Sequence, residues 1–288
     1  MKRNRFLAAA ALSLATLCAA GSAGGAHAEG EKHDLKPKFA ADAVVKYTME
    51  QKTSGTMKRG EEERKAVQNQ TLHITRKVVS TSETGAKVEL TITRVVASAT
   101  PPMGMGEPVS FDSDQDIEKD AGNMLALQYR QMIGKPYTID VALDGTITSV
   151  ELPKDALVKD SVESMKSTFG PLFQVKEGEP LTAAGESWEK SETLGGAAAG
   201  LNSTSTLTLT EVKEGVATVT FDSKISFKEG QTPPGMEFKE AGVKGTVLWS
   251  LTDGTLVEMN GTQTMHMTNS EVAMEVQSTT EMHVKRAE

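Results

Sequence analysis

The strongest constraint on the fold of this chain is an alternation of apolar and polar residues that returns many times along the sequence. It is clear from Val88 to Ile92, from Tyr137 to Leu143 and from Val247 to Leu251. Successive side chains of a β-strand point to opposite faces, so a period of two predicts strands with one apolar and one wet face. A single wet face is typical of antiparallel sheets, because parallel sheets are usually buried on both sides. The sequence therefore predicts a mainly β protein.

Two segments replace this period by helical spacing. Between Asp116 and Ile133, the apolar residues that share one helical face are Ile117, Ala121, Met124, Leu125 and Met132. Between Lys154 and Phe169, the corresponding residues are Val158, Val162, Met165 and Phe169, before Gly170-Pro171 ends the run. Each pattern is that of an amphipathic helix with one buried stripe. We expect a curved antiparallel sheet or half-barrel with these two helices packed on it.

Several landmarks occur twice in the same order. Leu72-His73-Ile74 resembles Leu207-Thr208-Leu209, and Asp144-Gly145-Thr146 returns as Asp253-Gly254-Thr255. This repetition predicts a single β-rich domain over residues 42–288, built from two related halves at about 42–152 and 185–285. A helical segment over 154–170 would join the halves. Residues 29–41 are charged and without periodicity, so we expect a flexible N-terminal tail there.

The N-terminal segment has the features of an export signal. Lys2, Arg3 and Arg5 precede an apolar run from Phe6 to Ala20, and Ala26-His27-Ala28 supplies the small-x-small cleavage pattern. The run is shorter than the roughly 20 residues that a membrane-spanning helix needs. We expect residues 1–28 to be removed, leaving a periplasmic or extracellular protein without a transmembrane segment.

The one cysteine, Cys18, lies inside this apolar run. Leu17, directly before it, fits a lipoprotein signal poorly, which argues against a lipid anchor. Removal of the signal would leave a mature chain without disulfides or thiolate ligands.

Removal of the signal would also make the chain more acidic. Three basic residues leave, so the net charge changes from 31 − 39 = −8 to 28 − 39 = −11. This charge repels nucleic acid and anionic lipid surfaces, and we expect no nucleic-acid partner. The charged run from Glu61 to Lys65 is interpreted as a solvated loop.

The sequence carries no catalytic or nucleotide-binding signature. There is no Gly-x-Ser-x-Gly elbow, phosphate-binding loop, dinucleotide fingerprint or His-Glu-x-x-His motif, so we expect neither an enzyme nor a cofactor. A copper site is the alternative raised by Met265, His266 and Met267, because thioether and imidazole groups suit that metal. Alternate strand residues face opposite sides, however, which separates His266 from the two methionines. The spacing favours methionines that fill a core.

Some passages resemble known families. They are Gly-Lys-Pro-Tyr-Thr-Ile-Asp-Val-Ala-Leu-Asp-Gly-Thr-Ile at 134–147, Gly-Glu-Ser-Trp at 185–188 and the final β-meander. In these the chain resembles uncharacterised exported bacterial proteins of duplicated β-rich build, and this resemblance implies no activity. More distantly, its layout is similar to the half-barrel of periplasmic lipoprotein carriers and related lipid-binding lipoproteins. In that family a curved sheet with helices beneath it holds acyl chains.

These observations predict an exported, non-enzymatic binding or interaction protein that holds a lipid or other apolar small molecule between sheet and helices. The candidate ligand-binding residues are Met124, Leu125, Met132, Tyr137, Ile139, Val162, Met165, Phe169, Phe221 and Trp249. The alternative is a structural module with a dry core that contacts an envelope protein. A hydrolase whose catalytic groups converge from distant positions is the less favoured third interpretation.

Overall fold

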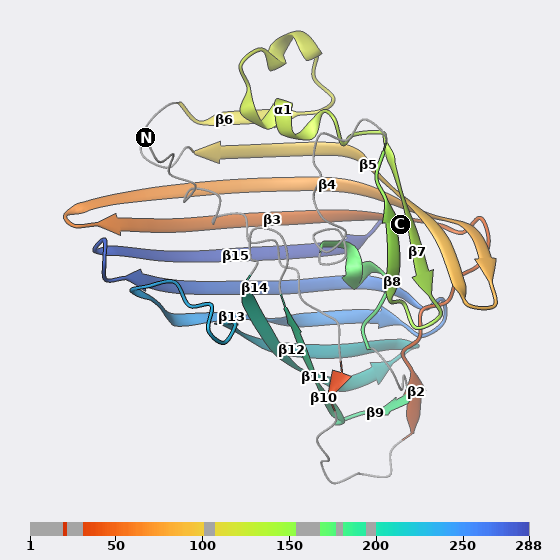
Figure 1. The fold of residues 1–288 in the computed structure, drawn as a ribbon. Helices are drawn as coiled ribbons and strands as arrows, with labels where there is room; N and C mark the ends of the chain where they lie inside the picture. Colours follow the sequence, from red (N-terminus) through yellow and green to blue (C-terminus); the bar gives the residue numbers. More distant parts are fainter. Residues whose placement is uncertain are drawn as a thin grey trace.

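The computed structural model describes residues 20–21, 31–100, 107–153, 168–176, 181–193 and 200–287. One 13-stranded antiparallel sheet dominates the fold (Figure 1). Its strands are β1 (Ala20–Gly21), β3 (Val44–Arg59), β4 (Glu62–Ser82), β5 (Gly85–Thr100), β6 (Val109–Asp112), β7 (Pro136–Ala142), β8 (Ile147–Glu151), β10 (Ser187–Thr193), β11 (Leu201–Lys213), β12 (Val216–Phe227), β13 (Met236–Ser250), β14 (Thr255–Asn269) and β15 (Met274–Arg286). A small second sheet pairs β2 (Lys32–Asp34) with β9 (Leu181–Ala183).

The large sheet consists of two meanders that lie side by side. Strands β10 to β15 follow one another in the sheet, as do β3, β4, β5, β7 and β8, while β6 pairs with β5. The C-terminal strand β15 joins the two meanders by pairing with β3, from Met274 opposite Arg59 to Arg286 opposite Tyr47. The prediction of a mainly β, antiparallel fold is confirmed. The sequence relationship between two halves stays a prediction.

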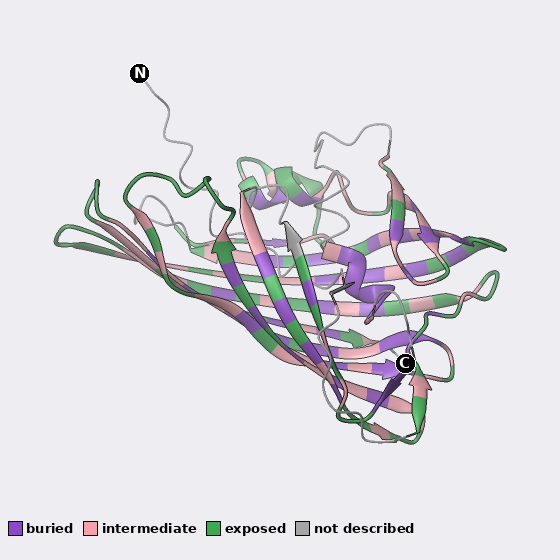
Figure 2. Cartoon of the chain, turned by 60° about the horizontal axis from the view of Figure 1, so that its bottom comes forward, coloured by how far each residue is buried: buried purple, intermediate pink, exposed green. Residues whose placement is uncertain are grey.

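The apolar residues of the alternating pattern lie on one face of this sheet. Leu72, Val219, Val284 and Trp249, each on a different strand, belong to one core cluster. We call the face that carries this cluster the inner face and the opposite one the outer face. Figure 2 shows that the sheet is curved and that the short helices lie on its concave side. Since Leu125 of one helix and Leu172 of another belong to the same cluster, the inner face is the concave one.

The helices are much shorter than the sequence predicts. In place of a helix over 116–133, the structure has a 3-10 turn, η2 (Ile117–Asp120), and a six-residue helix, α1 (Met124–Tyr129). Gly122, at a φ of 76°, and the N-cap Asn123 separate them. The helix α1 begins only at Met124. Its inward-facing residues are therefore Leu125 and Tyr129, whereas Ile117 and Met124 are 74% and 72% exposed. The predicted apolar face is therefore wrong for Ile117 and Met124, although Leu125 lies in the core and Met132 packs against it.

The second predicted helix lies largely outside the described residues, since 154–167 are not among them. The segment 168–176 that follows contains a 3-10 turn, η3 (Gly170–Leu172), with Pro171 at its start. Two amphipathic helices are thus not supported by the described part of the chain. No helix within it is long and apolar enough to cross a membrane.

Two segments without apolar periodicity are nevertheless part of the structure. Residues 31–41, expected to be a flexible tail, contain strand β2, and Leu35 beside it is fully buried in the core. In the run from Glu61 to Lys65, expected to be a loop, Glu61 lies in a turn, but the residues from Glu62 onward begin strand β4 and pair with β3. Cross-strand charge explains the second case, because Lys58 Nζ lies 3.6 Å from Glu63 Oε2. The interpretation of this run as a solvated loop is wrong.

Candidate functional site

Most of the predicted ligand-binding residues lie in the packed core of the inner face. Leu125, Tyr137, Ile139, Phe169, Phe221 and Trp249 all belong to the core cluster, and Met132 packs against it. Met124 is exposed for the reason given above and does not join them. Val162 and Met165 lie outside the described residues. The cluster members are buried in the core, and their role in ligand binding stays a prediction.

A second apolar group lies on the inner face but outside this core cluster. It consists of Met57, Phe227, Phe238, Met265 and Met267, and we call it the distal patch. Met267 pairs with Phe238 on β13 and with Val276 on β15, and Val276 pairs with Met57 on β3. The rings of Phe227 and Phe238 are stacked with centroids 4.5 Å apart. The patch therefore extends across five neighbouring strands, from β12 through β13, β14 and β15 to β3.

The sequence signal for the distal patch was present but was interpreted as core filler. Met265 and Met267 alternate with polar residues in β14, as core positions do, and each is 8% exposed. What distinguishes them is their contacts, because neither belongs to the core cluster. The register of β13, β14, β15 and β3 places Met267 opposite Phe238 and, on its other side, opposite Val276, which in turn lies opposite Met57.

The copper alternative is not assembled by the fold. Met265 and Met267 face inward, and His266 faces outward, where its Nε2 lies 2.9 Å from Glu275 Oε1 on β15. The register of β14 with β15 places Met265 opposite Ser278 and His266 opposite Gln277. No group of three or more histidine, cysteine or acidic side chains in the described ranges could hold a metal ion.

A row of polar side chains crosses the inner face beside the distal patch, with most of the core cluster on its other side. In sheet order its buried members are Ser205, Ser223, Gln263, Thr280 and Thr53, with Val243 between the second and third. The hydroxyls of Ser205 and Ser223 lie 2.7 Å apart, and those of Thr53 and Thr280 lie 3.1 Å apart. Gln263 Oε1 has no hydrogen-bond partner among the described residues. We call these residues the polar row.

A buried cation ties the segment 168–176 to the sheet. Arg76 on β4 is 2% exposed, its Nη1 donates to the Leu172 carbonyl oxygen at 2.8 Å, and its guanidinium lies 5.7 Å from the Phe173 ring centroid. Burial raises the pKa of the neighbouring Tyr47, and the charge of Arg76 opposes that rise. Sequence reasoning missed Arg76, although it continues the alternation of Leu72 and Ile74.

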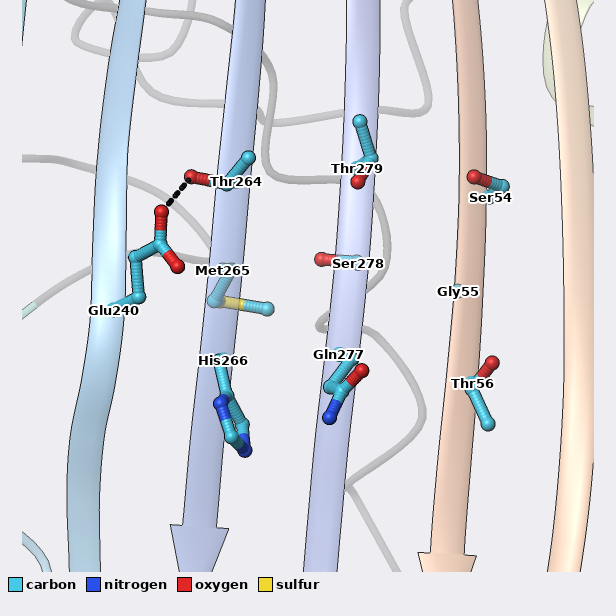
Figure 3. Close-up of a pocket in the computed structure, with 10 residues that line it drawn as sticks. All are labelled: Ser54, Gly55, Thr56, Glu240, Thr264, Met265, His266, Gln277, Ser278 and Thr279. Carbon is cyan, nitrogen blue, oxygen red and sulfur yellow. Dashed lines mark hydrogen bonds between the residues drawn. The ribbon is translucent and has the colours of Figure 1, made fainter.

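The outer face carries a shallow hollow of about 320 Å³ over β13, β14, β15 and β3 (Figure 3). Its walls are polar, and Thr264 Oγ1 donates to Glu240 Oε1 at 3.1 Å. Hydrogen bonds from Gln277 and then from His266 lower the pKa of Glu275, which lies beside the hollow. The hollow has the volume of a small ligand pocket, but such pockets are mostly apolar. Its chemistry does not suit an apolar ligand.

Comparisons with known proteins extend these observations. Residues 154–285 match the model of a family of unknown function, DUF6263. No curated protein gives a match. A structure concerned with lipid–protein interactions in lipovitellin superposes with a TM-score of 0.57 at 11% identity, covering 87% of this chain. The chain spans 26% of the length of that lipovitellin chain, and the likeness shows a shared sheet fold.

Two other solved structures are also similar, but only weakly. DynF from the dynemicin pathway of Micromonospora chersina has a TM-score of 0.24 at 7% identity, covering 95% of this chain and 94% of its own. OccK7 of Pseudomonas aeruginosa has a TM-score of 0.26 at 6% identity, covering 85% of this chain and 98% of its own. Neither similarity is close enough to carry a structural argument.

Proposed function

We propose that this chain is an exported, non-enzymatic binding protein that holds a lipid or other apolar ligand against the distal patch. The observation that carries the proposal is the patch itself, five large apolar side chains on the inner face that do not belong to the core cluster. Apolar groups that a fold gathers apart from its core mark sites for ligands or partners. The closely packed core cluster takes the structural role.

The composition of the distal patch suits a ligand of variable shape. Met57, Met265 and Met267 have unbranched, polarizable side chains that adapt to irregular apolar surfaces. The stacked rings of Phe227 and Phe238 supply a more rigid wall on one side. Support also comes from the lipovitellin structure, which shares the sheet fold over 26% of its length and concerns lipid–protein interactions in that protein. That support is analogy, since folds do not determine function.

The same proposal includes the cellular location of the protein, which the N-terminal segment supports. Positive residues, a short apolar run and the cleavage pattern before Glu29 favour export to the periplasm or beyond. The resulting charge of 28 − 39 = −11 disfavours adsorption to anionic membranes. A single apolar molecule held on the inner face is more consistent with this charge than a membrane surface.

A structural or envelope-associated module is the second candidate, and one observation favours it. Strand β8 is the last strand at one end of the large sheet, with no further strand paired to it in the described ranges. An unpaired edge can accept an extended segment of a partner protein. Co-purification of an envelope protein with an empty distal patch would favour this function over ligand binding.

Binding of the apolar fluorophore N-phenyl-1-naphthylamine tests the proposal with matched variants. Met267→Gln puts a polar group of similar size in the distal patch, so we expect at least about tenfold weaker binding from a lost hydrophobic contact. Thr268→Gln, one residue away on the outer face, should leave binding unchanged. Equal binding by both variants, with both folded by circular dichroism, would contradict the proposed site.

A further inference from the structure

We propose that the ligand is a neutral amphiphile whose polar end donates a hydrogen bond to Gln263, with its hydrocarbon chain on Met265 and Met267. An alcohol or an amide N–H has the required chemistry. This inference rests on the proposed function and adds the ligand class and its orientation.

Gln263 is the member of the polar row that lacks a partner. Its side chain is 4% exposed, and its Oε1 accepts no hydrogen bond in the part of the chain that the structure describes. Neither cross-strand neighbour donates to it, since Val243 is apolar and the Thr280 hydroxyl hydrogen-bonds with that of Thr53 instead. A buried acceptor without a donor is unfavourable, so a donor on the ligand would satisfy it.

The surroundings of Gln263 select an uncharged group. The adjacent inner-face residues are Val243 and Thr280 across the strands and Gly261 and Met265 along β14. Lys190, which lies opposite Ser205 at the end of the polar row, is on β10, four strands from β14 and thus about 19 Å from Gln263 at the usual strand spacing. No cation among the described residues therefore stands next to Gln263 to pair with a carboxylate or phosphate.

The orientation follows from what lies on either side of Gln263. On the side of the core cluster, Gly261 pairs with Gly245, and the Phe221 ring covers this position, since a Cβ on Gly245 would lie 2.6 Å from Phe221 Cζ. On the other side, Met265 and Met267 follow at about 7 and 14 Å along the strand. Only the second direction offers apolar surface outside the core cluster.

Three dodecyl compounds that differ at one end test this inference by displacing N-phenyl-1-naphthylamine from the full mature chain. Dodecan-1-ol can donate a hydrogen bond, 1-methoxydodecane can only accept one, and dodecanoate is anionic. We expect the alcohol to bind about tenfold tighter than the ether, the ratio that one hydrogen bond gives, and dodecanoate to bind more weakly than the alcohol. Gln263→Met, which conserves volume, should bring alcohol and ether within about twofold without weakening the ether.

The control is Thr262→Val, which removes a hydroxyl from the next residue on the outer face and should keep the tenfold preference. Equal binding of alcohol and ether by the parent chain would overturn the inference while leaving the proposed function intact. Tighter binding of dodecanoate or of the ether would overturn the ligand class. Failure of every dodecyl compound and of the fluorophore would instead reject the proposed function itself.

Discussion

Gly245→Ala is the substitution that most sharply tests the packing between the core cluster and the polar row. An added Cβ would lie 2.0 Å from the Asn260 carbonyl oxygen, 2.8 Å from Gly261 Cα and 2.6 Å from Phe221 Cζ. The ring can move, but the two backbone atoms belong to the paired strand β14, so β13 and β14 must separate locally. Overpacking of this kind costs about 3 kcal/mol, at the upper end of the usual range.

Thermal unfolding followed by circular dichroism measures this cost. For a chain of this size about 3 kcal/mol lowers Tm by roughly 6–12 °C. The matched control is Gly55→Ala, which is also at an inner-face position of a strand. The nearest atom to its new Cβ is the Gln277 carbonyl oxygen at 3.3 Å. We expect the control to cost less than about 1 kcal/mol, because alanine also orders a strand more readily than glycine. Equal Tm values for the two variants would refute the described register of β13 and β14.

Two further predictions concern single interactions. Asn123→Ala should lower the free energy of unfolding by about 1 kcal/mol, because the Asn123 side chain accepts hydrogen bonds from the first-turn amides of Leu125 and Ala126. Urea titration measures this loss, and an unchanged midpoint would contradict the cap. Burial raises the pKa of Asp253, but hydrogen bonds from Ser250, Arg286 and Thr255 outweigh it and hold that pKa below 3.8. The associated stability is present above that pH and lost as the pH falls through the folded-state pKa, so Asp253→Asn should cost more at pH 7 than at pH 3.

The period of two predicted the strands well because it records burial directly. Val88, Leu90 and Ile92 lie in the core cluster as expected, and both Asp-Gly pairs lie at turns where Gly145 and Gly254 have positive φ. The alternation did not predict a strand where charged residues take the place of apolar ones. The first residues of β4 pair with β3 through opposite charges, and no apolar stripe marks them as a strand.

The helix and the site depended on tertiary contacts that spacing does not encode. Ile117 and Met124 have the spacing of a buried stripe, yet Gly122 and Asn123 interrupt the helix between them. Phe227 and Met57 are distant in sequence and share one face of one sheet only because β15 pairs with β3 and joins the two meanders. That long-range pairing could not be predicted from either strand alone.

Native mass spectrometry of the exported mature chain, combined with organic extraction and lipid analysis of the same sample, tests the central claim most directly. We predict a stoichiometric adduct that extracts as a neutral amphiphile and that Met267→Gln diminishes, while Thr268→Gln retains it. A protein that carries no adduct and takes up neither dodecan-1-ol nor N-phenyl-1-naphthylamine would contradict ligand binding and leave the structural module as the better account.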